Sequence, residues 1–373
     1  MTSALRLLSA LTVLVLVADL GVLAERADDR RPPPSARADA VGVAAAPDLA
    51  RDAASRFLTR FVEPDGRVVR HDQASDTVSE GQAYAMLLAV AVDDRGTFDR
   101  VWEWTTRHLQ RPDGLLAWRW AAGAIVDPQP AADADLDAAW ALARAAERWP
   151  DGAYDAAAGR LAAAVDAHET GALPDGRPVL VPGPWARERA AAGRGLVLNP
   201  SYSSPAGEAF LVEAGHLPAG RSAARLATMR AVIGQLVEHG GVPTDWVVVA
   251  PDGTVHSTAG PERSEAGHFG WDAARVPLRL GTSCVRDDRT LAADLWPAFV
   301  AGAGTEAMGD HPARLVAAAA AAAAAGHRDR ATDLLERASR ADARAPTYYG
   351  GALTALGWTL LTTDRLGACG PLR

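Results

Sequence analysis

The sequence contains no lysine, so each of its 38 strongly basic side chains is an arginine. These are outnumbered by 46 acidic residues, and the formal net charge of the 373-residue chain is -8. A protein that grips a nucleic acid along its phosphates needs a stripe of positive charge. Because the sequence offers no such stripe, we do not expect nucleic-acid binding.

Cysteine is also scarce, with only Cys284 and Cys369 in the chain. Two cysteines are too few for a disulfide scaffold, and this pair lacks the close spacing of a structural zinc site. In an exported protein the two could pair, and the bond would then tie the C-terminus to the body by closing a long loop. The sequence leaves both the paired and the free state open.

Long apolar runs are absent except at the N-terminus, where mostly apolar residues extend from Leu7 to Ala24. Arg6 precedes the run, and its small-residue ending is typical of a signal peptide over residues 1–24. An uncleaved signal anchor is the alternative, although Asp19 would be costly inside a bilayer. We therefore expect a secreted or extracytoplasmic protein that contacts no membrane beyond a possible anchor through residues 7–24.

The next stretch, residues 25–48, is charged, rich in alanine and interrupted by Pro32-Pro33-Pro34. Such a composition buries too little apolar surface to fold and predicts a disordered tether. After it, no cluster of proline and glycine and no block of charge divides the chain. Because 49% of the residues are hydrophobic, we expect one large folded domain over residues 49–373.

Apolar residues recur with helical periodicity from residue 49 onward. In the helix predicted near residues 98–109, for example, Phe98, Val101 and Trp102 lie on one face. The run Ala317 to Ala325 predicts a packed helix, because alanine is the strongest helix former. Similar patterns predict helices over 49–62, 79–93, 135–149, 153–168, 206–214, 221–239, 271–283, 287–302, 309–325, 327–341 and 348–364.

These twelve helices predict an all-α fold, a toroid of paired helices whose inner members carry a site at one end. Two short β excursions interrupt the helical pattern. Residues 114–120 alternate large apolar side chains, and residues 245–255 predict a hairpin that turns at Pro251-Asp252-Gly253.

The segment Thr77 to Gln82 is predicted to start a helix. Ser79 and Gln82 fit a capping box, and Glu80 would then be a first-turn carboxylate favoured by the helix dipole. Capping does not explain Gly81, because glycine in a first turn costs stability and suits a place where another group approaches the backbone closely.

Three aspartates, Asp133, Asp135 and Asp137, stand at the start of another predicted helix, where acidic residues make good caps. A calcium loop is rejected because its sixth position is Ala138 rather than glycine and its twelfth is Arg144 rather than glutamate. Carboxylates this close repel one another, so a ligand, a proton or an arginine is needed to relieve the repulsion.

Two further clusters are weak signals when taken alone. If residues 271–283 are helical, Asp272 and Arg275 share a face, and a surface ion pair between them would contribute well under about 1 kcal/mol. Asn199 to Tyr202 is a turn-rich approach to the next helix.

In their order and spacing, these clusters together resemble glycoside hydrolase family 8, which includes bacterial endoglucanases. The resemblance covers roughly residues 50 to 365 and is specific through the combination of motifs. It rests on Ser79 to Tyr84 with the following helix at Phe98 to Trp102, on Ala131 to Trp149, on Asn199 to Tyr202, on Trp271 to Pro277 and on Tyr348-Tyr349.

The resemblance implies an (α/α)6 barrel, inversion at the anomeric carbon and no metal or organic cofactor. It also implies that Glu80 is the general acid, that Asp272 is the base that activates water, and that Asp133 holds and distorts the sugar beside the scissile bond. The cleft residues implied are Tyr202, Arg275, Trp271, Asp135 and Trp118, the last as a stacking platform for a neighbouring sugar.

The expected function is therefore inverting, endo-acting hydrolysis of a β-1,4-linked polysaccharide, most simply a cellulose-like β-glucan, by a monomer. Chitosan and xylan are alternative substrates. A non-catalytic glycan-binding or polysaccharide-synthesis accessory protein and a lyase acting on acidic sugars are alternative functions.

One electrostatic conflict accompanies the assignment of Glu80. A helix N-terminus lowers the pKa of a carboxyl, whereas an acid that works near neutrality needs a raised pKa. Burial of Glu80 and the negative charge of Asp133 would have to outweigh the dipole.

Overall fold

The computed structural model of the chain describes residues 36–238, 241–261 and 269–373. Residues 42–373 form one compact unit, which is separate from Met1–Val41. The predicted signal segment, residues 1–24, lies outside the described residues. Among the described residues, no helix is both long enough and apolar enough to cross a membrane.

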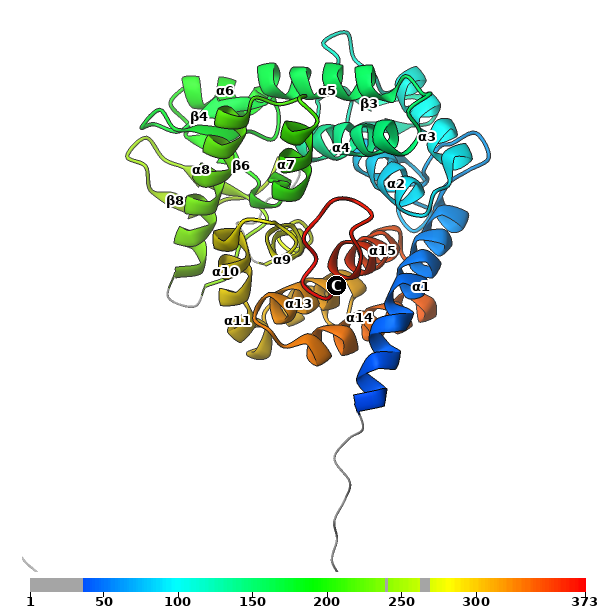
Figure 1. The fold of residues 1–373 in the computed structure, drawn as a ribbon. Coiled ribbons are helices and arrows are strands. Elements are labelled where there is room, and N and C mark those ends of the chain that lie inside the picture. The colour runs from blue at the N-terminus through cyan, green and yellow to red at the C-terminus, as the bar shows by residue number, and fades with distance from the viewer. Residues whose placement is uncertain (1–35, 239–240, 262–268) are drawn as a thin grey trace, which may run out of the picture. The chain divides into compact units, whose positions relative to one another are not determined.

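Six helices form an inner ring, and each contacts the next around it (Figure 1). The contact between the last of them and the first closes the ring. In chain order they are α2 (Ser79–Ala91), α4 (Ala132–Arg148), α7 (Pro205–Glu213), α9 (Arg275–Gly281), α13 (Pro312–Ala324) and α15 (Tyr348–Thr362).

A second set of helices alternates with these along the chain and lies outside them. It comprises α1 (Ala36–Phe61), α3 (Arg95–His108), α5 (Tyr154–His168), α8 (Ala219–Val237), α10 (Arg286–Asp294) and α14 (Arg328–Arg344). The C-terminal part of α1 packs on α15, because the rings of Phe57 and Phe61 each lie 6.1 Å from the ring of Tyr348. The pairing of inner and outer helices confirms the predicted (α/α)6 barrel.

Helix boundaries depart from the sequence prediction at several places, and two of these lie among the outer helices. The helix predicted over 287–302 is two helices, α10 and α11 (Trp296–Val300), because Pro297 suits only a first turn. Helix α1 already begins at Ala36, so residues 36–48 are helical rather than part of a disordered tether. Their high alanine content favours a helix despite Pro47.

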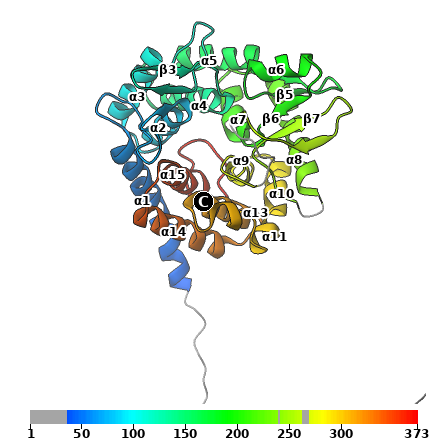
Figure 2. The same ribbon diagram turned by 180° about the vertical axis from the view of Figure 1, so that it is seen from behind.

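The additional short elements are mostly hairpins, and Figure 2 shows several beside α7 and α8. The predicted hairpin exists, with Val248 opposite His256, whereas residues 114–120 contribute the start of β2 and one isolated bridge, from Leu116 to Gln110. The antiparallel sheets are β1 (Thr77–Val78) with β2 (Arg119–Ala121) and β3 (Ala124–Asp127), β4 (Thr170–Ala172) with β5 (Pro178–Leu180), and β6 (Leu196–Leu198) with β7 (Val247–Val249) and β8 (Val255–Ser257). Helices α6 (Pro184–Ala191) and α12 (Thr305–Met308) and the 3₁₀ helix η1 (Pro200–Tyr202) are the remaining elements of the described residues.

The core of the ring is built largely from small side chains. All residues from Ala317 to Ala323 are buried, which confirms that the alanine run is a packed helix. The chain end crosses the middle of the ring in Figure 1, and Trp140 of α4 donates a hydrogen bond to the Leu366 carbonyl there at 3.0 Å. A disulfide between Cys284 and Cys369 fixes this end to the segment after α9, so the two cysteines are paired.

Candidate active site

The N-terminal ends of all six inner helices meet at one cavity of about 820 Å³. A helix N-terminus presents partial positive charge, so this convergence favours negative groups in the cavity. Each end supplies at least one lining residue, namely Glu80 from α2, Asp133 from α4, Tyr202 before α7, Asp272 and Arg275 at α9, His311 before α13, and Tyr348 and Tyr349 from α15.

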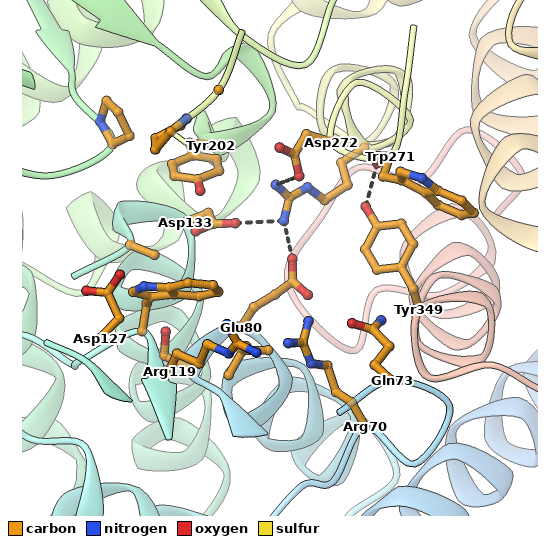
Figure 3. A pocket seen from close by; sticks show the side chains of 18 of the residues that line it. Arg70, Gln73, Glu80, Arg119, Asp127, Asp133, Tyr202, Trp271, Asp272 and Tyr349 are labelled. Atoms are coloured by element: carbon orange, nitrogen blue, oxygen red, sulfur yellow. Dashed lines mark hydrogen bonds and ion pairs between the residues drawn. The ribbon is translucent and has the colours of Figure 1, made fainter. Parts of the chain in front are cut away.

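The guanidinium of Arg275 is the hub of the site, and Figure 3 shows three carboxylates around it. Its Nη1 lies 2.5 Å from Oε2 of Glu80 and 2.6 Å from Oδ2 of Asp133. Its Nη2 lies 3.1 Å from Oδ1 of Asp272. Because the side chain of Arg275 is only 3% exposed, this is a buried network rather than the surface ion pair that the sequence suggests.

Glu80 occupies the first turn of α2 and keeps one fifth of its side chain exposed. The hydroxyl of Tyr348 donates a hydrogen bond to its Oε1 at 2.9 Å. Burial and the charge of Asp133 raise the pKa of the Glu80 carboxyl, although Arg275 and Tyr348 act in the opposite direction. The pKa is therefore shifted in the direction that a general acid requires, because burial outweighs the effect of the neighbouring arginine.

Gly81 is explained by the approach of Tyr348 to the start of α2. A Cβ at position 81 would lie 2.9 Å from the Tyr348 hydroxyl and 3.1 Å from a ring carbon. Any larger residue would therefore displace the phenol that bonds Glu80. This is the close approach to the backbone that the glycine predicts.

The predicted capping box at the start of α2 is wrong. Val78 is the N-cap residue and makes no capping bond through its side chain. Gln82 is instead buried, where its Oε1 accepts a hydrogen bond from the Val68 N–H at 2.6 Å and its Nε2 donates to Thr105 at 2.9 Å. A tertiary role outweighs the local motif here, because this amide fixes α2 against the outer helix α3.

Asp272 lies in a turn just before α9, so the helix predicted from residue 271 begins only at Arg275. Nδ2 of Asn199 donates to Oδ2 of Asp272 at 2.9 Å, and the side chain is 29% exposed. Burial raises the pKa of the Asp272 carboxyl, and the charges of Asp245 and Glu80 add to that effect.

Asp245 is a residue of this site that the sequence does not reveal. It is buried, and its Oδ1 accepts hydrogen bonds from the backbone N–H groups of Gly270 at 3.1 Å and Ala273 at 2.9 Å. These bonds hold the turn that carries Asp272. Nothing in the sequence around Asp245 signals this role, because the turn it holds is distant along the chain.

The three aspartates at the start of α4 lie in different surroundings. Asp133 points into the cavity, and its Oδ1 has no hydrogen-bond partner within the described part of the chain. Asp137 pairs with Arg279 through two contacts of 2.6 Å. Arginine therefore relieves the repulsion among these carboxylates at two of the three positions.

Asp135 does not reach the cavity, so its predicted role in substrate binding is wrong. It is completely buried, and its Oδ1 accepts a hydrogen bond from the Leu116 N–H at 2.9 Å. Residues two apart on a helix do not face the same side, so Asp133 and Asp135 could not both point into the cleft. Burial raises the pKa of the Asp135 carboxyl well above its ordinary value, and this favours its neutral form.

Aromatic side chains line the cavity on both sides of Arg275. The predicted residues Trp118, Tyr202 and Trp271 all belong to this lining. Trp185 and Trp246 join them there, with their rings 6.2 Å apart. The sequence contains 11 tryptophans, but this abundance does not tell cleft residues such as these two from core residues.

The arrangement combines two carboxyls of raised pKa, both held by one arginine, with flat apolar rings. Indole and phenol rings suit the apolar faces of sugar rings, and a pair of carboxyl groups can cleave a glycosidic bond. A cluster of three or more histidine, cysteine, aspartate or glutamate side chains that could hold a metal ion is not found in the described ranges.

Comparison with known proteins agrees with this chemistry. An endoglucanase of Cellulomonas uda is 37% identical over 241 residues, which cover 62% of this chain and 63% of that protein. The chain thus spans just under two thirds of that relative's length.

Two solved structures extend the comparison to most of the barrel. An endoglucanase from Klebsiella pneumoniae, a family 8 glycosyl hydrolase, superposes with a TM-score of 0.66 at 27% identity, covering 82% of this chain and 97% of that chain. An endo-β-1,4-glucanase from an Achatina fulica gut metagenomic library gives a TM-score of 0.67 at 26% identity, covering 82% and 96%.

The sequence profile of one family, the glycosyl hydrolases family 8, matches residues 40–363. This match contains every helix from α2 to α15 and most of α1. The chain therefore belongs to glycosyl hydrolases family 8.

Proposed function

We propose that the chain is an inverting, endo-acting hydrolase of β-1,4-glucan in which Glu80 is the general acid and Asp272 the general base. The observation that carries the proposal is the placement of these two carboxyls on different nitrogens of the Arg275 guanidinium. Both line the same cavity, so a sugar bound there can meet an acid on one side and a water-activating carboxylate on the other.

The chemical step follows from these positions. Glu80 gives its proton to the oxygen of the departing sugar while the bond from that oxygen to the anomeric carbon breaks. A water molecule attacks the anomeric carbon from the opposite face and gives a proton to Asp272. Exchange of protons with solvent then restores a protonated Glu80 and an ionised Asp272.

Asp133 would bind the sugar whose anomeric carbon reacts. Its Oδ2 is held by Arg275 and its Oδ1 is buried without a partner among the described residues, so a small rotation of the carboxylate would offer an oxygen to a sugar hydroxyl. A hydrogen bond that strengthens as the ring distorts lowers the barrier to cleavage.

The aromatic lining supports a polymeric substrate. Tyr202 and Trp271 lie on either side of Asp272 in Figure 3, so rings are available for sugars on both sides of the bond to be cut. The relatives described above are named endoglucanases, and this favours internal cleavage of a β-glucan over xylan or chitosan.

We further propose that the enzyme works outside the cytoplasm as a monomer. The Cys284–Cys369 disulfide is typical of an oxidising compartment, in agreement with the signal-like segment at residues 1–24. One chain closes the ring and supplies every described residue of the cleft, so the proposed reaction needs no second subunit.

The test is incubation of the purified protein with carboxymethylcellulose, xylan and chitosan. We expect new reducing ends and a rapid fall in viscosity with carboxymethylcellulose, and proton NMR should show the inverted anomer first. Unsaturated products would identify a lyase instead. Glycan binding without new reducing ends would identify a non-catalytic binding protein.

A further inference from the structure

His311 and Thr347 form a polar pair on the wall of the cleft that the proposed mechanism does not use. Both line the cavity. His311 is the N-cap residue of α13, and Thr347 is the N-cap residue of α15, so each stands at the end of an inner helix. The rings of Trp271 and His311 pack in a T-shaped arrangement, with centroids 4.7 Å apart and planes at 87°.

The hydrogen bonds of His311 fix which of its ring nitrogens carries hydrogen. Nδ1 accepts a hydrogen bond from the Ala313 N–H at 3.2 Å, so this nitrogen is unprotonated. Burial lowers the pKa of His311, against an opposing effect of Asp72, so the ring is neutral. A neutral imidazole then carries its hydrogen on Nε2, and this N–H donates to Oγ1 of Thr347 at 3.1 Å.

The Thr347 oxygen therefore accepts two hydrogen bonds. The second comes from the Gly350 N–H at 3.1 Å, as the cap of α15. A hydroxyl has two acceptor lone pairs and one hydrogen, so both lone pairs are occupied and only the O–H remains. No acceptor for that hydrogen occurs among the residues that the structure describes, and the side chain lines the cavity.

Gly350 shows that this arrangement is closely built. A Cβ at position 350 would lie 2.7 Å from Oγ1 of Thr347 and 3.4 Å from Cε1 of His311. A side chain there would push the threonine and the histidine apart. Only glycine at position 350 therefore lets its own N–H and the His311 ring reach the same hydroxyl.

We propose that Thr347 is a substrate-binding residue, oriented by His311, which donates its hydroxyl hydrogen to an oxygen of a sugar lying against Trp271. The proposal rests on the proposed function only in that a glycan occupies the cleft. The substrate would then meet a hydroxyl at the N-terminal end of α15, in addition to the carboxylates contributed by α2, α4 and the turn before α9.

The test compares Thr347→Val, which keeps the shape but loses the hydroxyl, with Thr347→Ser, which keeps the hydroxyl. Binding of cellohexaose is measured by titration calorimetry at low temperature, before turnover, and KM and kcat are measured separately. Loss of one neutral hydrogen bond should raise both the Kd and the KM of Thr347→Val by roughly threefold to tenfold. We expect Thr347→Ser to stay within about twofold of the wild type, with kcat changing less than KM in both.

Loss of the helix cap needs its own control. Asp94 caps α3 by accepting a hydrogen bond from the Thr97 N–H at 3.0 Å and does not line the cavity. Asp94→Ala should lower the thermal stability much as Thr347→Val does, but leave the Kd for cellohexaose unchanged. A Thr347→Val protein that binds as the wild type does, or a serine variant as weak as the valine variant, would overturn the proposal.

A second variant keeps the proposal testable if Thr347→Val does not fold. His311→Asn can still accept from the Ala313 N–H but is too short to donate to Thr347. The hydroxyl would then no longer be oriented, and we expect binding about twofold to fivefold weaker. Unchanged binding would contradict the role of His311. Because binding is measured without turnover, a protein that binds but fails to hydrolyse would refute only the proposed function.

Discussion

The hydroxyl of Tyr348 donates to Oε1 of Glu80 at 2.9 Å, so the last inner helix of the ring fixes the carboxyl carried by the first. This hydrogen bond joins α15 to α2, the two helices whose contact completes the inner ring. It also sets one of the opposing influences on the pKa of Glu80, because a hydrogen bond donated to the carboxylate favours its ionised form.

Replacing Tyr348 by phenylalanine should therefore shift the pH dependence of the reaction. Glu80 acts in its protonated form, so kcat/KM falls as the pH rises through its pKa. Tyr348→Phe removes a donor that lowers this pKa, while Arg275 and Arg70 still lower it and burial and Asp133 still raise it. We expect the alkaline limb of the kcat/KM profile to move to higher pH.

The matched control is Tyr349→Phe, because the Tyr349 hydroxyl donates to the carbonyl of Trp271 at 2.7 Å rather than to Glu80. Its alkaline limb should stay where the wild type has it. A shift to lower pH in Tyr348→Phe would show that the hydroxyl does not act on Glu80 as inferred.

Glu80→Gln removes the proposed acid while keeping the size of the side chain. General acid catalysis contributes about 10²- to 10⁴-fold, so we expect kcat on carboxymethylcellulose to fall by at least that range. Binding of cellohexaose should persist, since the aromatic lining is untouched. Full activity in this variant would remove Glu80 from the mechanism.

Asp133→Asn and Asp135→Asn differ by two positions in the chain and should differ sharply in effect. Asp133 lines the cavity, so its loss of charge should lower kcat by about 10²-fold or more if it holds the reacting sugar. Asp135 is buried and favours its neutral form, which asparagine imitates, so the wild-type rate should be retained. Steady-state rates on one soluble glucan decide between the two, and equal losses would refute the assignment.

Arg275→Gln should cost both stability and activity. Removing one partner of a buried ionic network leaves uncompensated charges, which costs about 3–5 kcal/mol in the free energy of unfolding. Arg330→Gln is the control, because its ion pair with Asp333 is about half exposed and such pairs contribute about 0–1 kcal/mol. Urea unfolding monitored by circular dichroism gives both values, and similar losses in the two variants would contradict the network.

The ring of helices could be predicted because its signal is local. Each helix shows its own apolar periodicity, and alternate inner and outer helices follow one another along the chain. The acid-bearing segment could be recognised for the same reason. Gly81 is also informative, because a glycine in a first turn lowers helix stability and so indicates a group that approaches the backbone closely. That group is Tyr348.

Features that depend on distant contacts could not be predicted. Gln82 fits a local cap but bonds to Val68 and Thr105, and Asp245 holds a turn far along the sequence. The motif predicts Asp135 in the cleft, but a residue two positions after Asp133 on one helix faces another side.

Gly81→Ala tests the geometry of the acid directly. The added Cβ would stand 2.9 Å from the Tyr348 hydroxyl, so either the phenol or the start of α2 must move. Alanine favours a helix over glycine by about 1 kcal/mol, yet overpacking of this kind costs about 1–3 kcal/mol, so we expect a small net loss of stability. The rate should fall further than the loss of stability alone explains, because Tyr348 no longer holds Glu80.

Gly96→Ala, near the start of α3, is the control for Gly81→Ala. Its Cβ would meet nothing closer than 3.6 Å, so the stability should stay the same or rise and the rate should not change. If Gly81→Ala behaved like Gly96→Ala in melting temperature and kcat, the glycine would not be there to admit the tyrosine.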